Sequence, residues 1–530
     1  MLLAVLLGVG AAAQDDEVLR AACYLSGAAS AEEVPAEWVE FVESLQGRRL
    51  RVNAKGLRPG LLSSYQIACI ADYRATSGDI LSWEELALVD GFSREAVAAL
   101  RPFLSLESFS GIQADSARLS ATAFVRRTLK QLGGKAKLSY GGLRLGGTLR
   151  EEATWYGEYS GPRVRLLLGH YNVRMAQGLA FWSGFSMDQL STVDAFIRRS
   201  SGVTPAWSWS PDGLYRGAAC EYGSRHWTAS VFGDLPGKKL GGHVQYQGRQ
   251  GSLGLTAGTE AISLDGRLNH RGTDWAGELA WKNRSLAGKA ALSSRLTDRF
   301  RLAMQARIIP SRFSGKKYGE YALAAGGAWK SRKHNASLTT DLSLLPLPGS
   351  TGNPFSRTQV RVYAFWTWQA SPGWSLQLRA TERYRNYERP RTALRAQAGY
   401  ASALGSGTWT STLRAESVFC EKTGLLAYGE SGLKFPGGSA FYLRATAFHA
   451  PRWNDRIYVY ERDAPGSFSV PAYYGRGAAL SCYAALAYRP RPRLRLLSRL
   501  CLKANLRAAC TWRSGSAPSP ALKLQLQCSL

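Results

Sequence analysis

The stretch that decides the fold is RLRLLSRLCLK, residues 493–503, near the C-terminus. Leucine occupies positions 494, 496, 500 and 502, whereas arginine or lysine occupies positions 493, 495, 499 and 503. On a helix, at about 100° per residue, these leucines would scatter around the axis and form no apolar stripe. On a strand, alternate residues point to opposite faces. The stretch therefore predicts a strand with one apolar face and one charged face.

The same alternation recurs over most of the chain beyond residue 114. Apolar side chains keep one parity in RFRLAMQARI (299–308), VRVYAFWTW (360–368), FYLRATAFH (441–449) and the last run, ALKLQLQCSL (521–530). Runs of about ten residues match a tilted strand that spans a membrane, and Trp and Tyr recur near many of them, as interfacial girdles require. A soluble, secreted β adhesin would alternate too, so the run length, the girdles and the apolar terminal Leu530 favour a barrel in lipid.

The length and the N-terminus suggest how the chain is divided. Of 530 residues, 416 follow position 114, which accommodates about 20–24 strands at roughly 17 residues per strand and turn. We predict an α+β multidomain fold: a small N-terminal all-α domain at 14–110, a linker at 111–116 and a large antiparallel transmembrane β-barrel at 117–530. Residues 1–13 predict a signal peptide, because an apolar run meets small residues before Gln14; a buried N-terminal helix is the alternative.

Eight cysteines are scattered along the chain without a Cys-x-x-Cys pair, which argues against a cysteine zinc site. Export would permit disulfides, and Cys23 with Cys69 is the pair we expect. Cys482, Cys510 and Cys528 fall on the apolar parity of their stretches, so we expect them to face lipid.

The segment at 60–106 carries a resemblance to a known module. It contains a helix ending in Ile70-Ala71-Asp72-Tyr73-Arg74, a Gly78 stop, Leu81-Ser82-Trp83-Glu84-Glu85-Leu86, and a hairpin at 89–93 followed by another helix. This pattern resembles tandem helix-hairpin-helix modules of the competence DNA-uptake receptor type. Together with GHYNVRMAQGLAFWSGFS (169–186), LYRGAA (214–219) and YERDAPGSFSVPAYYGRG (460–477), it resembles a group of Bacteroidetes outer-membrane proteins that carry such repeats. The resemblance implies architecture more than activity.

The resemblance also implies a binding hairpin, at Gly91, Phe92, Ser93 and Arg94. In DNA-binding members, backbone N–H groups at a helix N-terminus hold a phosphate, and glycines let it approach. Here Ser93 replaces the second glycine, and residues 15–110 hold nine Lys/Arg against 15 Asp/Glu, a net charge of −6. Nonspecific DNA affinity comes mostly from Lys and Arg. We therefore favour a periplasmic module that docks on a protein partner or on the barrel mouth, and keep DNA binding and uptake as the alternative.

The barrel half carries the positive charge. The whole chain has a net charge of +28, so removing the −6 of residues 15–110 leaves +34. Lipopolysaccharide phosphates would explain this charge, as would an anion-attracting lumen lined by Arg493, Arg495 and Arg499. Residues 172–213 alternate poorly, and long insertions of this kind often fold inward as a constriction or form an outer loop. We expect inward folding, with Arg198 and Arg199 near the pore.

No catalytic pattern emerges from the sequence. The six histidines include no His-Glu-x-x-His or similar ligand set, and no Gly-x-Ser-x-Gly elbow occurs. We therefore expect no catalytic residues, no metal site and no small-molecule cofactor. The prediction is an outer-membrane β-barrel channel or envelope-assembly scaffold in contact with lipid and lipopolysaccharide, with its helix-hairpin-helix module in the periplasm.

Overall fold

The alternating runs form the strands of one closed antiparallel barrel of 24 strands in the computed structural model. The structure describes residues 14–529 except 47–48, 55–56, 108–118, 162, 185–189, 225, 249, 348–356, 489–496, 512–513 and 516–518. At 14–16, 497–499 and the described part of 504–521, only the backbone is described. The predicted range of about 20–24 strands is confirmed at its upper end. The expected signal peptide and the linker at 111–116 lie outside the described residues.

The barrel strands run in sequence order around the ring, and the last, β30, pairs with the first, β3, to close it. The first twelve are β3 (Leu119–Thr128), β4 (Leu132–Tyr140), β5 (Leu143–Leu149), β6 (Ala153–Ser160), β7 (Val164–Arg174), β9 (Tyr215–Gly223), β10 (Trp227–Asp234), β11 (Lys239–Gln247), β12 (Gly251–Gly258), β13 (Ala261–His270), β14 (Thr273–Lys282) and β15 (Ser285–Arg295). The second twelve are β16 (Phe300–Ile309), β17 (Glu320–Lys330), β18 (His334–Leu344), β19 (Thr358–Gln369), β20 (Trp374–Arg385), β21 (Glu388–Leu404), β22 (Gly407–Phe419), β23 (Thr423–Lys434), β24 (Ala440–Ala450), β27 (Gly475–Tyr488), β28 (Leu497–Thr511) and β30 (Ser519–Ser529).

The described part of the C-terminal stretch with alternating leucines, residues 497–503, behaves as predicted. Leu500 of β28 lies opposite Leu526 of β30, and these side chains are 44% and 48% exposed. Cys501 and Lys503, on the other parity, are buried. The leucines therefore face outward and the alternate residues face inward, as period-two alternation requires.

The two ends of the barrel differ in their connections. At one end, called the short-turn end here, strands are joined by brief connections such as 271–272, 370–373 and 405–406. The opposite, long-loop end carries the connections 175–214 and 451–474. Aromatic contacts cluster at the short-turn end, where Trp374, Tyr400 and Trp409 pack in a row with ring centroids 4.8 and 5.4 Å apart. The girdle expected from the sequence is thus present at this end.

The N-terminal segment is helical, as predicted. Its elements are α2 (Gln14–Ser26), η2 (Ala31–Glu33), α3 (Ala36–Ser44), α4 (Ser64–Ser77), α5 (Trp83–Leu86), α6 (Arg94–Leu100) and η3 (Arg101–Phe103), with a parallel pair of β1 (Leu50–Arg51) and β2 (Leu104–Ser105). Ser82 caps α5 in a capping box with Glu85. The helices share one apolar core that includes Val42, Leu62 and Leu100.

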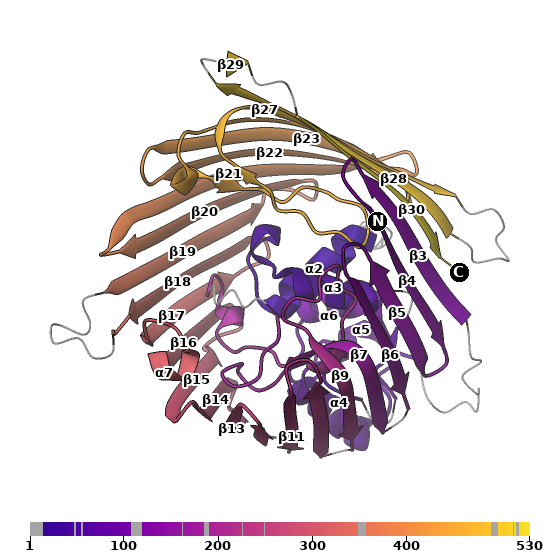
Figure 1. The fold of residues 1–530 in the computed structure, drawn as a ribbon, viewed down its shortest axis with the longest axis vertical. Helices are drawn as coiled ribbons and strands as arrows, with labels where there is room; N and C mark the ends of the chain where they lie inside the picture. The colour runs from indigo at the N-terminus through magenta and orange to yellow at the C-terminus, as the bar shows by residue number, and fades with distance from the viewer. Residues whose placement is uncertain are drawn as a thin grey trace.

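We expected a periplasmic module that docks on a protein partner or on the barrel mouth; in the structure the helical domain extends into the barrel. Figure 1 shows α2, α3 and α6 inside the ring of strands. Near the short-turn end, Arg58 donates to Ser160 Oγ at 3.1 Å, and Lys330 of β17 forms an ion pair with Glu95 at 2.5 Å. The physical reason is charge: a domain of net −6 lies within a barrel of net +34.

Both long connections also fold into the lumen, as expected for 172–213. The first contains η4 (Val193–Ala195) and β8 (Gly202–Pro205), which pairs with β7. The Glu278 carboxylate accepts hydrogen bonds from the backbone N–H groups of Gln177, Leu179 and Ala180. The second connection contains η5 (Trp453–Asp455), β25 (Ile457–Tyr458) and β26 (Ala472–Tyr473). Two minor elements, α7 (Ser311–Ser314) and β29 (Ser514–Gly515), complete the structure.

The predicted Cys23–Cys69 disulfide is not present, since both cysteines are free. They lie on α2 and α4, where each packs against the core of the helical domain. Burial raises the pKa of both thiols to about 12, which keeps them in the neutral form that suits an apolar core. Cys528 is exposed on the outer face, as expected; Cys482 is partly buried.

Candidate functional site: the ion-pair seat of the helical domain

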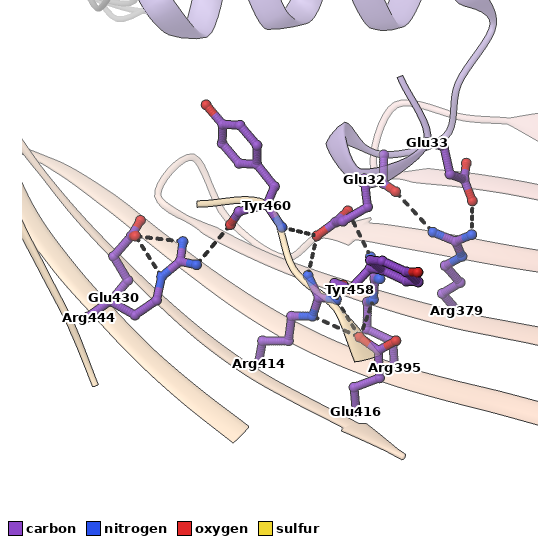
Figure 2. Close-up of polar contacts among 11 residues, drawn as sticks. Glu32, Glu33, Arg379, Arg395, Arg414, Glu416, Glu430, Arg444, Tyr458 and Tyr460 are labelled. Carbon is purple, nitrogen blue, oxygen red and sulfur yellow. Dashed lines mark hydrogen bonds and ion pairs between the residues drawn. The ribbon is translucent and has the colours of Figure 1, made fainter. Parts of the chain in front are cut away.

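The helical domain is seated on the barrel wall by two consecutive carboxylates, Glu32 and Glu33. They lie in the short 3₁₀ turn η2, which Ser30 precedes in extended conformation and Pro35 follows. Because the turn is tight, both side chains project from one corner of the domain toward strands β20–β22 (Figure 2). A sequence reading that concentrated on the hairpin at 89–93 passed over this turn.

Glu32 is the centre of the seat. Its carboxylate forms ion pairs with Arg414 at 2.5 Å and Arg395 at 3.3 Å, and it accepts a hydrogen bond from the backbone N–H of Tyr460 at 3.2 Å. The Glu32 side chain is only 9% exposed. One carboxylate therefore joins the helical domain, two barrel strands and the inward connection 451–474.

Glu33 makes the second attachment. It forms an ion pair with Arg379 of β20, and the same guanidinium donates to Ser30 Oγ at 3.0 Å. Arg379 thus binds residues at both ends of the short turn. A planar guanidinium suits this role because its donors are held in a fixed fork.

The seat continues along the inner wall as a chain of charges. Arg395 and Arg414 both contact Glu416, the former at 3.0 Å. Further along, Glu430 pairs with Arg444 at 2.7 Å, and Arg444 donates to the Tyr460 carbonyl at 2.8 Å (Figure 2). The inward connection and the helical domain are therefore held by one continuous network, whose members are all paired.

Electrostatics favour the charged form of the central carboxylate. Burial by itself would raise the pKa of Glu32, but the guanidinium groups of Arg395 and Arg414 outweigh it and hold the pKa well below its usual range. Glu40, on α3, shows the opposite balance. Burial raises its pKa, and the nearby Lys135 and the hydroxyl of Ser208 offset this only in part.

The hairpin residues Gly91, Phe92, Ser93 and Arg94 lie at the turn before α6. Gly91 has a φ of +79°, and its carbonyl accepts a hydrogen bond from Gln66 at 2.9 Å. Phe92 is buried, and the Ser93 hydroxyl caps α6 by accepting from the Ala96 N–H at 3.1 Å. Arg94 is exposed. The hairpin thus uses its serine to close its own helix, while Gly91, Phe92 and Ser93 also line a lumen cavity.

Arg198 and Arg199 lie in the inward connection 175–214 and line the same cavity. Arg199 donates to the Leu61 carbonyl at 3.0 Å and to Gln66 of the helical domain, while Arg198 stacks over Trp182 at 4.4 Å. Burial lowers the pKa of Arg199 from its ordinary value. These arginines therefore connect the two parts that fill the lumen.

Of the remaining predicted lumen residues, Arg493 and Arg495 lie outside the described residues. The backbone of Arg499 pairs with that of Gln527 in β30, and its side chain lies outside the described residues. Within the described part of the chain, no group of three or more His, Cys, Asp or Glu side chains is arranged to hold a metal ion.

The outer surface defines the class of protein. Leu253, Leu264 and Leu323 are 59%, 48% and 54% exposed, and comparable leucines cover the outside of nearly every strand. Their inward neighbours are buried and often polar, such as Thr256 and Asp341. A closed barrel with an apolar exterior and a polar interior is the arrangement of a β-barrel that spans a membrane. No helix of the described residues is long and apolar enough to cross a membrane.

Comparisons with known proteins find only distant structural likeness. No protein-family model matches the chain, and no curated protein matches it. Among solved structures, a chain of the E. coli P pilus tip assembly intermediate PapC-PapD-PapK-PapG aligns with a TM-score of 0.46 and 10% identity, over 79% of this chain and 62% of that one. A chain of the FpvAI–pyocin S2 complex aligns with a TM-score of 0.38 and 9% identity, over 79% of this chain and 74% of that one. Pseudomonas aeruginosa OccK5 (OpdH) aligns with a TM-score of 0.31 and 10% identity, over 78% of this chain and 96% of that one. At such scores, none of them bears on function.

Proposed function

We propose that the protein is a non-catalytic outer-membrane channel whose N-terminal helical domain closes the lumen and must move for solutes to pass. The observation that carries this proposal is the seat itself: the acidic turn at Glu32 and Glu33 is bound by Arg379, Arg395 and Arg414 of the inner wall. Polar contacts of this kind release reversibly, whereas an apolar interface would hold the domain as part of a permanent core.

The orientation follows from the two ends of the barrel. In outer-membrane barrels, short turns face the periplasm and longer loops face outward. The helical domain contacts the short-turn end through Arg58 and Glu95, so it would be reached from the periplasm. The net charge of +34 on the rest of the chain would suit both lipopolysaccharide at the outer leaflet and the passage of anions.

A charge swap tests this function. Purified full-length protein in planar lipid bilayers should conduct poorly. Glu33→Arg should open it, because two cations would then face each other at Arg379, and the double variant Glu33→Arg/Arg379→Glu should close it again. A wild-type protein that conducts as an open 24-stranded pore would overturn the proposal, and so would a double variant as open as the single one.

A second role, docking of a periplasmic protein on the helix-hairpin-helix region, is supported by two exposed leucines. Leu81 and Leu88 flank α5 and are 71% and 83% exposed, which is costly unless a partner covers them. DNA uptake has less support, since the domain is acidic and Ser93 caps its own helix. Cross-linking of wild-type protein and of Leu81→Ser/Leu88→Ser in cells would distinguish these roles. A partner retained equally by both would discard the docking surface.

A further inference from the structure

A lumen cavity of about 610 Å³ lies where the helical domain, the inward connection 175–214 and the barrel wall meet. The helical domain contributes Trp38 and the hairpin, the connection contributes Trp182, and strands β13–β16 contribute Arg267 and Lys289. The seat around Glu32 lies against β20–β22, and Glu33 of the same turn also lines the cavity.

The lining of this cavity is cationic. Eight arginine or lysine side chains line it, against five aspartate or glutamate side chains. Three of those five acids are already engaged in ion pairs: Glu33 with Arg379, Asp194 with Arg301 at 2.8 Å, and Asp274 with Arg267 at 3.0 Å. Two of these pairs also use lining cations, so six cations and the acids Glu37 and Asp90 remain, and the cavity keeps an excess of positive charge.

One cation in the cavity, Arg174, has no polar side-chain partner. It stands at the end of β7, is 2% exposed, and lines the cavity. Its guanidinium lies over two indole rings, 5.0 Å from the centroid of Trp38 and 5.8 Å from that of Trp182. Its Nε has no hydrogen-bond partner, and no described residue forms an ion pair with it.

An unpaired buried guanidinium is costly, because each donor removed from water without an acceptor loses the energy of a hydrogen bond. The other arginines of the lumen show how the chain normally avoids this cost. Arg199 reaches Gln66 and the Leu61 carbonyl, and Arg414 reaches Glu32 and Glu416. Arg174 differs in that its guanidinium lies near two indole rings and lines the cavity, with the carboxylates of Glu37 and Glu40 as nearby charges but not as ion-pair partners.

We propose that Arg174 is the anchor of a binding site for the oxyanion of a small acidic solute, a carboxylate, phosphate or sulfate group. The planar fork of an arginine matches such groups with two parallel hydrogen bonds. The surrounding excess of cations would draw the solute into the cavity, and the indole rings of Trp38 and Trp182 would keep the fork in place. This site deepens the proposed function, on which its role in passage rests, by naming the class of solute.

Binding is best measured on the closed, full-length protein by isothermal titration calorimetry in detergent. Sodium sulfate, sodium phosphate and sodium glucuronate would be titrated separately, at constant ionic strength with chloride as the competing anion. We expect saturable binding of at least one of these anions, and the anion with the highest affinity identifies whether the natural group is tetrahedral or a carboxylate.

Two substitutions at the anchor and one control give the decisive comparison. Arg174→Gln should weaken binding at least tenfold, and Arg174→Lys should weaken it less, because the charge remains but the fork is lost. Arg391→Gln removes an equal charge elsewhere, since Arg391 donates to the Arg456 carbonyl at 2.9 Å and does not line the cavity, and it should bind as wild type does. Assembly of each variant would be checked by heat-modifiable gel migration. If Arg174→Gln does not assemble, the affinity of Arg174→Lys is the result that tests the site.

Absence of saturable binding by wild type, or equal loss in the Arg391 control, would overturn the site. These results do not depend on conductance. If the wild-type barrel binds the anion but is constantly open, the binding site stands and the proposed closure by the helical domain fails. If the barrel opens on the charge swap but binds no anion, the closure stands and the binding site fails.

Discussion

Removing the charge of Glu32 should release the helical domain from its seat. In Glu32→Gln, two arginines that share one buried carboxylate lose it, although Glu416 still contacts both. Breaking one side of a buried ion pair costs about 3–5 kcal/mol, and the remaining Glu416 places this case at the lower end. A cost of about 3 kcal/mol corresponds to a shift of roughly 150-fold toward the open state.

The assay is single-channel recording in planar bilayers, with opening frequency as the readout. The matched control is Glu84→Gln, which removes the same charge from an exposed position of the same helical domain. Glu32→Gln should open far more often than wild type, and Glu84→Gln should not. Equal opening frequencies for the two variants would refute the reasoning that this carboxylate holds the domain.

Three further predictions follow from single groups. The depressed pKa of Glu32 means that its stabilising contribution is present above the unfolded pKa of about 4.3 and is lost as the pH falls through the folded value. Conductance recorded as a function of pH should therefore stay low at pH 5 and rise below about pH 4. A channel that stays closed at pH 2 would contradict this. The raised pKa of Glu40 has the opposite effect: its contribution to stability is present below the unfolded pKa and is lost as the pH rises through the folded value. Glu40→Gln should therefore raise the midpoint of thermal unfolding at pH 7. A lowered midpoint would show that the charged form of Glu40 is needed. Gly91→Ala should destabilise the helical domain by about 1–2 kcal/mol, because the φ of this residue is +79° and the new Cβ would lie 2.9 Å from the Tyr65 ring. Limited proteolysis should cleave this variant faster than wild type within residues 14–107. An unchanged cleavage rate would refute the predicted strain.

The barrel could be predicted from the sequence because its signal is local. Each strand shows alternation within about ten residues, and the stretch around Leu500 and Lys503 is sufficient to tell the outer face from the inner one. The helices around Ser82 and Ser93 were equally visible, since capping and turn residues act over one or two turns.

The seat could not be predicted, because it joins residues far apart in the sequence. Glu32 and Arg414 are 382 positions apart, and nothing in the surroundings of either one indicates the other. The opposite charges of the two halves were a signal for their association, but we interpreted it as evidence against DNA rather than as attraction between the halves. The unpaired state of Arg174 is likewise a property of packing, visible only once Trp38 and Trp182 are brought to it.

The central claim is that the helical domain lies inside the lumen in the membrane, and a cross-link tests it most directly. Glu33 and Arg379 form an ion pair through the ends of long side chains, so cysteines at both positions would lie within reach of a short bismaleimide cross-linker, whereas a direct disulfide requires closer backbones. Mass spectrometry of digested outer membranes from cells producing Glu33→Cys/Arg379→Cys should detect the joined peptide, and Glu84→Cys/Arg379→Cys should not yield its equivalent. Failure of the first pair to join in assembled protein, or equal joining of both pairs, would contradict a domain seated at Arg379.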